Sequence, residues 1–327
     1  MISKRCRPLL ALVLALILAV PFGAAAQGDY PARAISMVVP YPPGGVNDLV
    51  ARAVGEKMSI ALGKPVVIAN RAGAATTVAS NFVAKAAPDG YTIYAGGTSL
   101  VINPTLQGNV AYDVRRDFRP VSLMSVTPFI LHVNKDLPVT DFASLVAHAR
   151  ANPDKLNIAS SGIGATNHMA AELLKDAAQI RLVHVPYRGG ALAGQDVAAG
   201  NAQMMFSASI EAIPLLEGKM TRAIAISSAR RSAAFPDLPT IQEAGGPKDF
   251  DVTFWQAMVV PAGTPQPIVD KIVAATRAAV DDPELGKQFA SKGVELRSST
   301  PEELSRLIDR EEAVWTKLIR EKGIKAE

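Results

Sequence analysis

The sequence predicts an α/β protein of two lobes, and three observations lead to that class. Strand-like apolar segments alternate with segments whose apolar residues recur at helical spacing. Such alternation is typical of a mostly parallel sheet flanked by helices. The second half of the chain repeats the style of the first. About 300 residues follow a removable leader, a length that suggests two domains.

Residues 1–26 have the pattern of a secretory signal peptide. Three cations precede an apolar run over residues 9–20, and alanines at 24–26 form a small-residue cleavage site. A membrane anchor is the alternative, but the run is short and Pro21 and Gly23 interrupt it. We therefore expect a periplasmic protein exported by a cleaved N-terminal signal peptide.

The remaining chain carries almost balanced charge. The full sequence has 34 lysines and arginines against 30 acidic residues, and three of those cations lie in the leader. Nothing here favours nucleic acid or an anionic membrane as a partner. The only cysteine, Cys6, also lies in the leader, so we expect no disulfide and no thiolate chemistry in the mature chain.

Apolar spacing and helix-ending residues predict the order of helices and strands along the chain. The helix over 47–62 is predicted by Val50, Val54 and Met58 on one face, and Gly63 ends it. In chain order we expect strand 35–40, helix 47–62, strand 66–69, helix 77–87, strand 91–95, helix 141–151, strand 156–160, helix 166–178 and strands near 181–186, 203–206 and 221–226.

Beyond Trp255, three helices are expected to begin with proline in the first turn, at 264–265, 282–283 and 300–301. Thr300 and Glu303 fit a capping box. The last helix carries an apolar stripe, formed by Leu304, Leu307, Ile308, Val314, Trp315 and Leu318.

The stretch VVPYPPGGVND, residues 38–48, joins the first strand to the first helix. In a parallel α/β sheet, ligands bind in the loop after a strand's carboxyl end. The following helix directs free N–H groups and a partial positive charge at that loop. Because Gly44 and Gly45 carry no side chains, the corner is suited to hold an anion. An ordinary tight turn capped by Asn47 or Asp48 is the alternative.

A second corner favours the anion interpretation. Residues 156–174 read LNIASSGIGATNHMAAELL, again a strand, a glycine loop and a helix. Two such corners lie about 120 residues apart, and across a cleft they would hold one ligand from both sides. Neither loop contains lysine or arginine. The ligand's charge is therefore expected to meet backbone amides, hydroxyls and helix N-termini.

The chain resembles a known family through an ordered set of motifs. These are YPARAISMVVPYPPGGVNDLVAR, NRAGA, PDGYTIYAGGTS, NPDKLNIASSGIGATNH, VHVPYRGG and VVPAGTPQ. The set resembles the extracytoplasmic solute receptors of the tripartite tricarboxylate transporter system, the Bug or TctC-like proteins. The resemblance covers essentially the whole mature chain.

That resemblance implies a type II periplasmic-binding-protein fold, in which two α/β lobes close like a clamshell on a small organic acid. It implies a first lobe of residues 27–125 plus 253–327 and a second lobe of 126–252. The binding positions it implies, together with those argued above, are Tyr41, Pro43, Gly44, Gly45, Val46, Asn47, Asp48, Thr76, Thr98, Ser99, Ser160, Ser161, Gly162, Gly164, Ala165, Thr166, Asn167, His168, Tyr187, Arg188 and Ser207.

Three stretches depart from the family pattern. Val46 and Asn47 stand where the family has Gly and then Ser or Thr, and residues 72–76 replace Pro-Gly-Ala-Gly-Gly. Ser207 stands where an aspartate is frequent. The last change mildly favours a plain carboxylate ligand over an amino acid, because a carboxylate partner for an ammonium group is missing.

Single residues keep two interpretations. Asp48 either caps the helix or shapes the ligand loop. Arg188 either reaches a distal ligand carboxylate or forms a salt bridge between loops. Tyr41 is expected to wall the pocket. His168 and Glu172 have a metal-ligand spacing, but no third ligand is evident, so we expect no metal and no cofactor.

The receptor class accounts for export, two lobes and twin corners together. A catalytic set is missing: there is no Gly-x-Ser-x-Gly elbow, and Gly162–Asn167 lacks the third glycine of a dinucleotide loop. We expect no enzyme, with a secreted hydrolase using Ser160 or Ser161 as the remote alternative. The expected partners are inner-membrane permease subunits, or a membrane two-component kinase if the chain is a sensor. The protein itself is expected to be a monomer.

Overall fold

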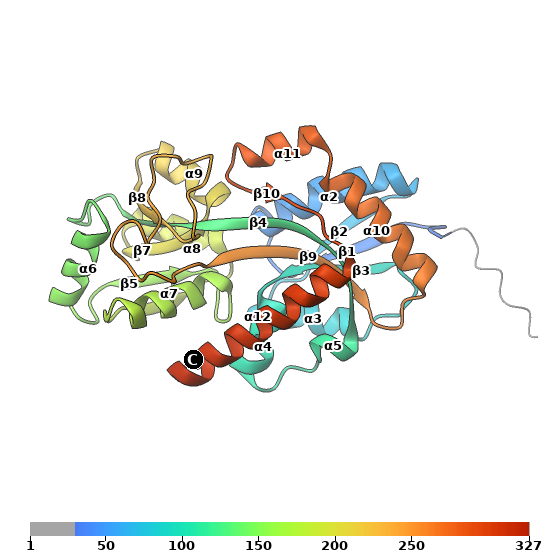
Figure 1. Cartoon of the computed structure of the whole chain (residues 1–327), viewed down its shortest axis with the longest axis horizontal. Coiled ribbons are helices and arrows are strands. Elements are labelled where there is room, and N and C mark those ends of the chain that lie inside the picture. The colour runs from blue at the N-terminus through green and yellow to red at the C-terminus, as the bar shows by residue number, and fades with distance from the viewer. Residues whose placement is uncertain (1–29, 327) are drawn as a thin grey trace, which may run out of the picture.

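The computed structural model describes residues 30–326, so the leader prediction for residues 1–26 lies outside the described residues. Two groups of elements lie at opposite ends of the molecule's long axis, and the long strands β4 (Phe118–Asn134) and β9 (Thr253–Pro261) run between them (Figure 1). A mixed sheet flanked by helices confirms the predicted α/β class. No helix within residues 30–326 combines the length and apolarity needed to span a bilayer.

The first lobe contains the early and the late elements of the chain, on the right in Figure 1. They are β1 (Ile35–Val39), α2 (Val46–Leu62), β2 (Val66–Asn70), the short 3-10 helix η1 (Ala74–Thr76), α3 (Thr77–Ala84), β3 (Thr92–Gly97), α4 (Ser99–Gln107), α5 (Val114–Asp117), α10 (Gln266–Val280), α11 (Pro283–Ala290), β10 (Glu295–Leu296) and α12 (Pro301–Lys322).

The second lobe contains the middle of the chain. Its elements are α6 (Phe142–Ala151), β5 (Asn157–Ser160), α7 (Thr166–Ala177), β6 (Val183–Pro186), α8 (Gly190–Ala199), β7 (Met204–Ala208), α9 (Ser209–Glu217) and β8 (Thr221–Ile226). In both lobes the expected strand and helix ranges agree with these bounds to within about three residues. The helices α4, α5, α8 and α9, the 3-10 helix η1 and the strands β4, β9 and β10 were not among the expected elements.

The strand order β2-β1-β3-β9-β4-β7-β5-β6 makes one path through both lobes. The outer pairs β1–β2, β1–β3, β5–β6 and β5–β7 are parallel. The two long strands are antiparallel to each other, because each passes from one lobe to the other in opposite directions. Strand β4 pairs with β9 through Pro128 and with β7 from Phe129 onward. The lobe boundaries at 125/126 and 252/253 stay a prediction.

An apolar cluster runs through both lobes along these strands. In the first lobe it contains Met37 and Ile93, and in the second it contains Leu131 and Ile158, all fully buried. The capping box of Thr300 and Glu303 is confirmed, and Leu304, Ile308 and Trp315 of the last helix are buried as predicted. Val314 was placed on that stripe wrongly: it is 53% exposed, because it lies one residue off the buried face.

Leu131→Ala tests how much this packing stabilises the fold. Deleting a fully buried leucine should lower the free energy of unfolding by about 2–5 kcal/mol, because the transferred surface is lost and a cavity remains. Equilibrium urea denaturation measures the change. Ile60→Ala on α2 is the matched control: its side chain is 76% exposed. We expect it to stay within about 0.5 kcal/mol of wild type. Equal effects of the two substitutions would contradict this packing.

Candidate ligand-binding site

The first corner, residues 38–48, is held by Asp48, whose carboxylate accepts a hydrogen bond from the loop before α2. Strand β1 ends at Val39, and α2 begins at Val46 without a side-chain cap on Gly45. Asp48 Oδ2 accepts hydrogen bonds from the Gly44 N–H (3.0 Å) and from Arg52 (2.9 Å), and its Oδ1 accepts from Asn70 (2.8 Å). Asp48 therefore shapes the loop from inside the helix's first turn.

Burial would raise the pKa of the Asp48 carboxyl, but hydrogen bonds from Arg52, Asn70 and Gly44 outweigh it and hold that pKa below its ordinary value. The carboxylate is charged at neutral pH. Its negative charge is matched by Arg52, and it accepts from the Gly44 N–H, which precedes the helix, and not from the N–H groups at the start of α2.

The second corner is a glycine loop held by an amide side chain. Gly162 and Gly164 adopt φ of +134° and +73°, a region that favours glycine. Asn167 Oδ1 accepts from the Ser161 N–H (3.3 Å) and hydroxyl (3.0 Å), and its Nδ2 donates to the Phe206 carbonyl (3.1 Å). Asn167 thus fixes the loop to β7, and α7 begins at Thr166 without a side-chain cap.

Two adjoining cavities separate the corners. The first has a volume of about 280 Å³ and is lined by Tyr41, Pro42, Pro43, Gly45, Val46, Asn47, Phe129, Ser161, Thr166, Asn167, Arg188, Gly189, Gly190, Ala191, Leu192, Ala208, Glu211 and Phe254. The second, of about 390 Å³, is lined by Pro40, Tyr41, Pro42, Ala72–Thr76, Ser161–Ile163, Ala165, Tyr187 and Arg188. Both draw residues from both lobes.

Four helices begin at the first cavity, and none of them has a side-chain cap. They are α2 from the first lobe and α7, α8 and α9 from the second. Elsewhere α5, α6, α11 and α12 are capped by Asp113, Asp141, Asp282 and Thr300. Helices α3, α4 and α10 are also uncapped: α3 directly follows residues 74–76, which line the second cavity, and a proline in the first turn of α10 removes one donor. The cavity therefore collects helix-start N–H groups from both lobes that no N-cap side chain accepts, and one of them, that of Val46, donates to Glu211.

Two polar side chains at this cavity have buried atoms without partners. Asn47 and Thr166, each 2% exposed, belong to the first turns of α2 and α7. Both polar atoms of the Asn47 amide and the Thr166 hydroxyl make no hydrogen bond within the described chain. Unpaired buried polar groups destabilise a fold. Their location indicates a site shaped for a polar ligand.

The predicted site residues fall into two groups. Those that line one or both cavities are Tyr41, Pro43, Gly45, Val46, Asn47, Thr76, Ser161, Gly162, Ala165, Thr166, Asn167, Tyr187 and Arg188. Those that line neither are Gly44, Asp48, Thr98, Ser99, Ser160, Gly164, His168 and Ser207.

Several residues of the second group hold the lining in place. Ser99 Oγ bonds the Tyr41 hydroxyl (3.0 Å), and the Gly164 N–H donates to His168 Nδ1 (3.2 Å). Ser207 lies in buried β7 with its hydroxyl 2.7 Å from His132 Nε2. Ser207 therefore lines neither cavity, and a serine at this position does not disfavour an ammonium ligand.

The sequence interpretation missed four large side chains that line the first cavity: Phe129, Leu192, Glu211 and Phe254. Glu211 carried a usable signal. It lies in the first turn of a helix that directly follows a buried strand, the same arrangement as at the two corners. Its Oε1 accepts from the Val46 N–H (3.0 Å), and desolvation raises its pKa to about 7.

The aromatic and cationic groups at the cavities are uncharged or unpaired. Burial raises the pKa of Tyr41 to about 12, so its hydroxyl stays protonated. Tyr187 donates to Asp196 (2.6 Å), and desolvation followed by this bond raises its pKa to about 12. Arg188 is exposed, lines both cavities and makes no ion pair in the part of the chain that the structure describes.

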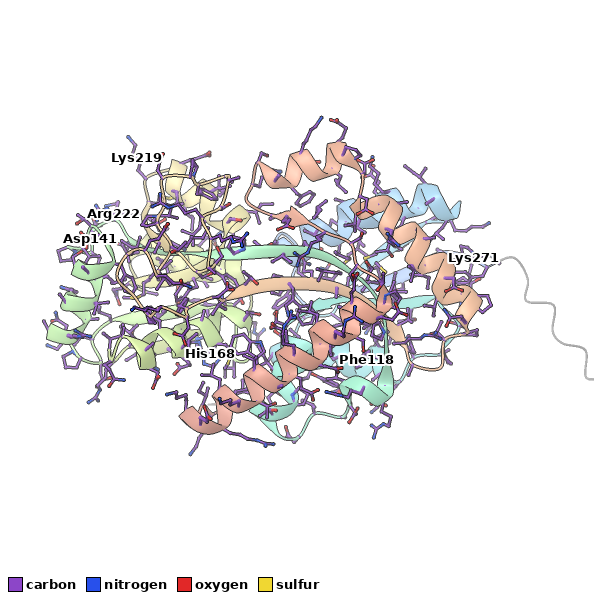
Figure 2. All side chains as sticks on the ribbon, viewed as in Figure 1. Phe118, Asp141, His168, Lys219, Arg222 and Lys271 are labelled. Atoms are coloured by element: carbon purple, nitrogen blue, oxygen red, sulfur yellow. The ribbon has the colours of Figure 1, made fainter. Side chains whose placement is uncertain are left out.

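A histidine pair lies behind the second corner. The rings of His168 and His184 stack with centroids 4.0 Å apart, and His184 Nε2 lies 2.7 Å from Ser160 Oγ. Figure 2 shows His168 in the half that contains α7, with Phe118 in the other half. Desolvation lowers the pKa of His168 to about 4 and that of His184 to about 3. No cluster of three metal-ligating side chains occurs among residues 30–326.

The comparisons with known sequences point to one family. A model described as the tripartite tricarboxylate transporter family receptor matches residues 50–324. A protein of Pseudomonas sp. strain P51, described as a UPF0065 protein in the tcbD–tcbE intergenic region, is 38% identical over 297 residues, 91% of this chain and 88% of that protein. Protein BugT of Bordetella pertussis is 32% identical over 302 residues, 90% of this chain and 91% of BugT.

Solved structures agree. The periplasmic binding protein BugD is 32% identical with a TM-score of 0.86, covering 91% of this chain and all of BugD. An R. palustris protein solved with adipate is 32% identical with a TM-score of 0.87, and the match covers 90% of this chain and 99% of that protein. MatC of Rhodopseudomonas palustris, solved with malate, is 32% identical with a TM-score of 0.82, and the match covers 89% of this chain and all of MatC.

The fold and the cavity between its halves define a two-lobed solute-binding protein of the periplasmic class. The chain belongs to the receptor family of the tripartite tricarboxylate transporters, the TctC or Bug proteins. Both the family resemblance and the two-lobed fold predicted from the sequence are confirmed.

Residues 74–76 generate a prediction about backbone strain. Ala74, Ala75 and Thr76 adopt φ of +42°, +52° and +77°, where the family pattern has glycine at the last two positions. A left-handed conformation costs a non-glycine residue roughly 1–2 kcal/mol. Ala75→Gly should therefore raise the free energy of unfolding by about 0.5–1 kcal/mol in urea denaturation.

The matched control for that substitution is Ala147→Gly, an exposed site within right-handed α6. There the same replacement should destabilise by about 1 kcal/mol. Opposite signs at the two alanines support strain in the 74–76 loop, and destabilisation at both would contradict it.

The buried histidines predict how stability depends on pH. His132, His168 and His184 have folded-state pKa values of about 4, 4 and 3. An unfolded histidine titrates near 6.5, so below that pH the unfolded chain binds protons that the folded chain does not. Each histidine should lower stability by up to about 1.4 kcal/mol per pH unit as pH falls from 6.5 toward 4.

Glu211 acts in the opposite direction, because its raised pKa of about 7 lets the folded state hold one proton more between about pH 7 and 4.5. Three histidines outweigh one glutamate, so the free energy of unfolding should still fall as pH falls from 6.5 toward 5. Urea denaturation at pH 7, 6 and 5 measures it. His132→Asn should flatten the slope, with His148→Asn on α6 as control. Stability that stays flat between pH 6.5 and 5 would contradict the neutral, buried state of these histidines.

Proposed function

We propose that this receptor binds a small organic acid, as its carboxylate, between its two lobes. The observation that carries the proposal is the convergence of four uncapped helix starts, from both lobes, on one cavity. N–H groups at helix N-termini and the positive end of the helix dipole bind anions without a cationic side chain. Two related receptors were solved with adipate and malate, both carboxylates, which supports this ligand class.

In this proposal the residues that line the cavities contact the ligand, and those behind them hold the contacts in position. Asn47 and Thr166 supply the polar atoms that lack a partner without ligand. Gly162 and Gly45 allow close approach to the backbone. Asp48, Ser99, Asn167 and His168 fix the loops and Tyr41 through the hydrogen bonds given above.

Ligand binding would stabilise the closed arrangement of the lobes, because the ligand contacts both at once. The pairing of β4 changes between Pro128 and Phe129, and β9 begins at Thr253, which supports a hinge near the predicted boundaries. We propose that the closed form, exported to the periplasm by a cleaved signal peptide and acting as a monomer, delivers its acid to the membrane permease of a tripartite tricarboxylate transporter.

Thermal unfolding against a panel of acids tests the ligand class. The panel contains dicarboxylates, tricarboxylates, hydroxy acids, aromatic acids and amino acids, each with its neutral amide. At a hundred times its dissociation constant a ligand adds about 2.7 kcal/mol of stability, a shift of several degrees. We expect a shift with an acid and none with its amide. A panel in which amides shift the midpoint as much as acids would contradict carboxylate binding.

Thr166→Val tests the helix-start contact with little change of shape. The unpaired hydroxyl destabilises the free protein, so its removal should leave stability equal or higher. Affinity for the acid should fall about ten-fold, the effect of one lost hydrogen bond to a charged group. Isothermal titration measures the affinity, and urea denaturation measures the stability.

Thr221→Val is the matched control, because the Thr221 hydroxyl is also buried and unpaired but lies on β8, away from both cavities. It should leave affinity unchanged. If both variants lost affinity equally, or if neither lost affinity, the Thr166 hydroxyl would not be a ligand contact.

A further inference from the structure

Glu211 is the only acidic side chain that lines either cavity in the described structure, and it connects the lobes. It lies in the first turn of α9 in the second lobe, and its Oε1 accepts the Val46 N–H of α2 in the first lobe at 3.0 Å. Two glycines leave room for it: a Cβ on Gly190 would overlap the carboxyl group, and one on Gly45 would lie 3.0 Å from Oε1. The site is therefore built around this carboxyl group.

The second carboxyl oxygen, Oε2, has no hydrogen-bond partner among residues 30–326, and the carboxyl group forms no ion pair there. The side chain stays partly accessible through the cavity. A desolvated carboxylate with a single donor is costly, and this accounts for its raised pKa of about 7. A ligand group that donates to Oε2 would remove that cost.

None of the charged groups that the structure describes around Glu211 donates a hydrogen bond to Oε2, so a ligand group can be that donor. On α2, Asp48 and Arg52 pair with each other, and Tyr41 remains a neutral phenol. Arg188 lines the same cavity but is exposed. Strands β4 and β9 present the apolar Phe129 and Phe254.

The remaining titratable groups on the packed elements are engaged or distant. Asp196 on α8 accepts from Tyr187, and His132 on β4 bonds Ser207. Glu217 lies exposed at the far end of α9. No protein group in the described structure supplies the donor that Oε2 lacks.

We propose that Glu211 is a specificity-determining residue that accepts a hydrogen bond from a hydroxyl or ammonium group on the ligand. The inference rests on the proposed carboxylate function of the same cavity. Glu211 and the proposed carboxylate contacts meet at the start of one helix, since Val46 and Asn47 are consecutive. The donor therefore belongs on the carbon next to the ligand's carboxylate, and the preferred ligand is a 2-hydroxy or 2-amino acid.

Matched acids test this inference by isothermal titration. One set is succinate, malate and aspartate, and the other is propionate, lactate and alanine, so that only the group on carbon 2 changes within a set. The wild type should bind the hydroxy or the amino member of a set at least ten-fold more tightly than the unsubstituted acid. Which of the two gains identifies the donor as hydroxyl or ammonium.

Glu211→Gln keeps the shape and changes the chemistry. Its amide oxygen can accept the Val46 N–H, which leaves the NH₂ group facing the ligand, so a preference for an ammonium group should disappear. A hydroxyl could accept from that NH₂ group, so Glu211→Leu, which offers neither donor nor acceptor, is the variant that should abolish a preference for a hydroxyl. Gly190→Ala is a second variant. Its methyl group would overlap the Glu211 carboxyl group and move it, so the preference should disappear although residue 211 is still glutamate. Glu217→Gln, on the same helix, is the control and should keep the preference.

The outcomes separate the inference from the function beneath it. A wild type that binds none of the six acids would overturn the inference, and the carboxylate function would fall with it only if the wider acid panel also gave no acid-specific shift. A wild type that binds unsubstituted acids as tightly as their counterparts, or a preference that survives in Glu211→Leu, would overturn the inference alone. It would also fall if affinity for succinate weakened as pH rose through 7 in wild type but not in Glu211→Gln, because Glu211 would then take a proton instead of a ligand donor.

Discussion

The unsatisfied N–H groups at the start of a helix are the constraint on which this site depends. A helix must find partners for its first donors, and proteins usually supply a side-chain oxygen. This chain does so at α5, α6, α11 and α12, and not at α3, α4 and α10. It leaves α2, α7, α8 and α9 uncapped at one cavity. The two long strands bring these helices together from distant parts of the sequence. The result is a charge-complementary surface for an anion that needs no lysine.

The same region carries features that lower stability without ligand. The Asn47 amide and the Thr166 hydroxyl are unpaired, and residues 74–76 hold left-handed backbone without glycine. Glu211 is desolvated with one donor. Natural proteins retain such features where binding needs them, because the ligand supplies the missing partners. Their concentration at the contact between the lobes is a physical reason to place the ligand there.

Local signals in the sequence predicted much of the architecture. Gly63 ends α2 in the left-handed conformation, and Thr300 caps α12 with Glu303, as expected from their positions. The two glycine corners were recognised because a strand, a glycine loop and a helix follow one another in the sequence. These features depend on neighbours within a few residues, which is what a sequence pattern records.

Features that depend on distant neighbours were missed or left open. The 17-residue β4 has no internal signal that it changes pairing partners at Phe129. Ser207 gave no sign that it faces His132 and not the ligand, and Glu211 joins Val46 across 165 positions of sequence. Whether Arg188 pairs with another loop also depended on the three-dimensional placement of that loop. The pockets' walls are set by packing between lobes, which no local pattern encodes.

Backbone amide NMR of the ¹⁵N-labelled mature chain, titrated with the acid that stabilises it most, tests whether helix starts of both lobes hold the ligand. N–H resonances in the first turns of both α2 and α7 should shift together along one saturation curve, and the neutral amide of the same acid should leave them unmoved. Shifts confined to one lobe, or centred on the histidine pair behind the second corner, would contradict a carboxylate held between helix starts of both lobes.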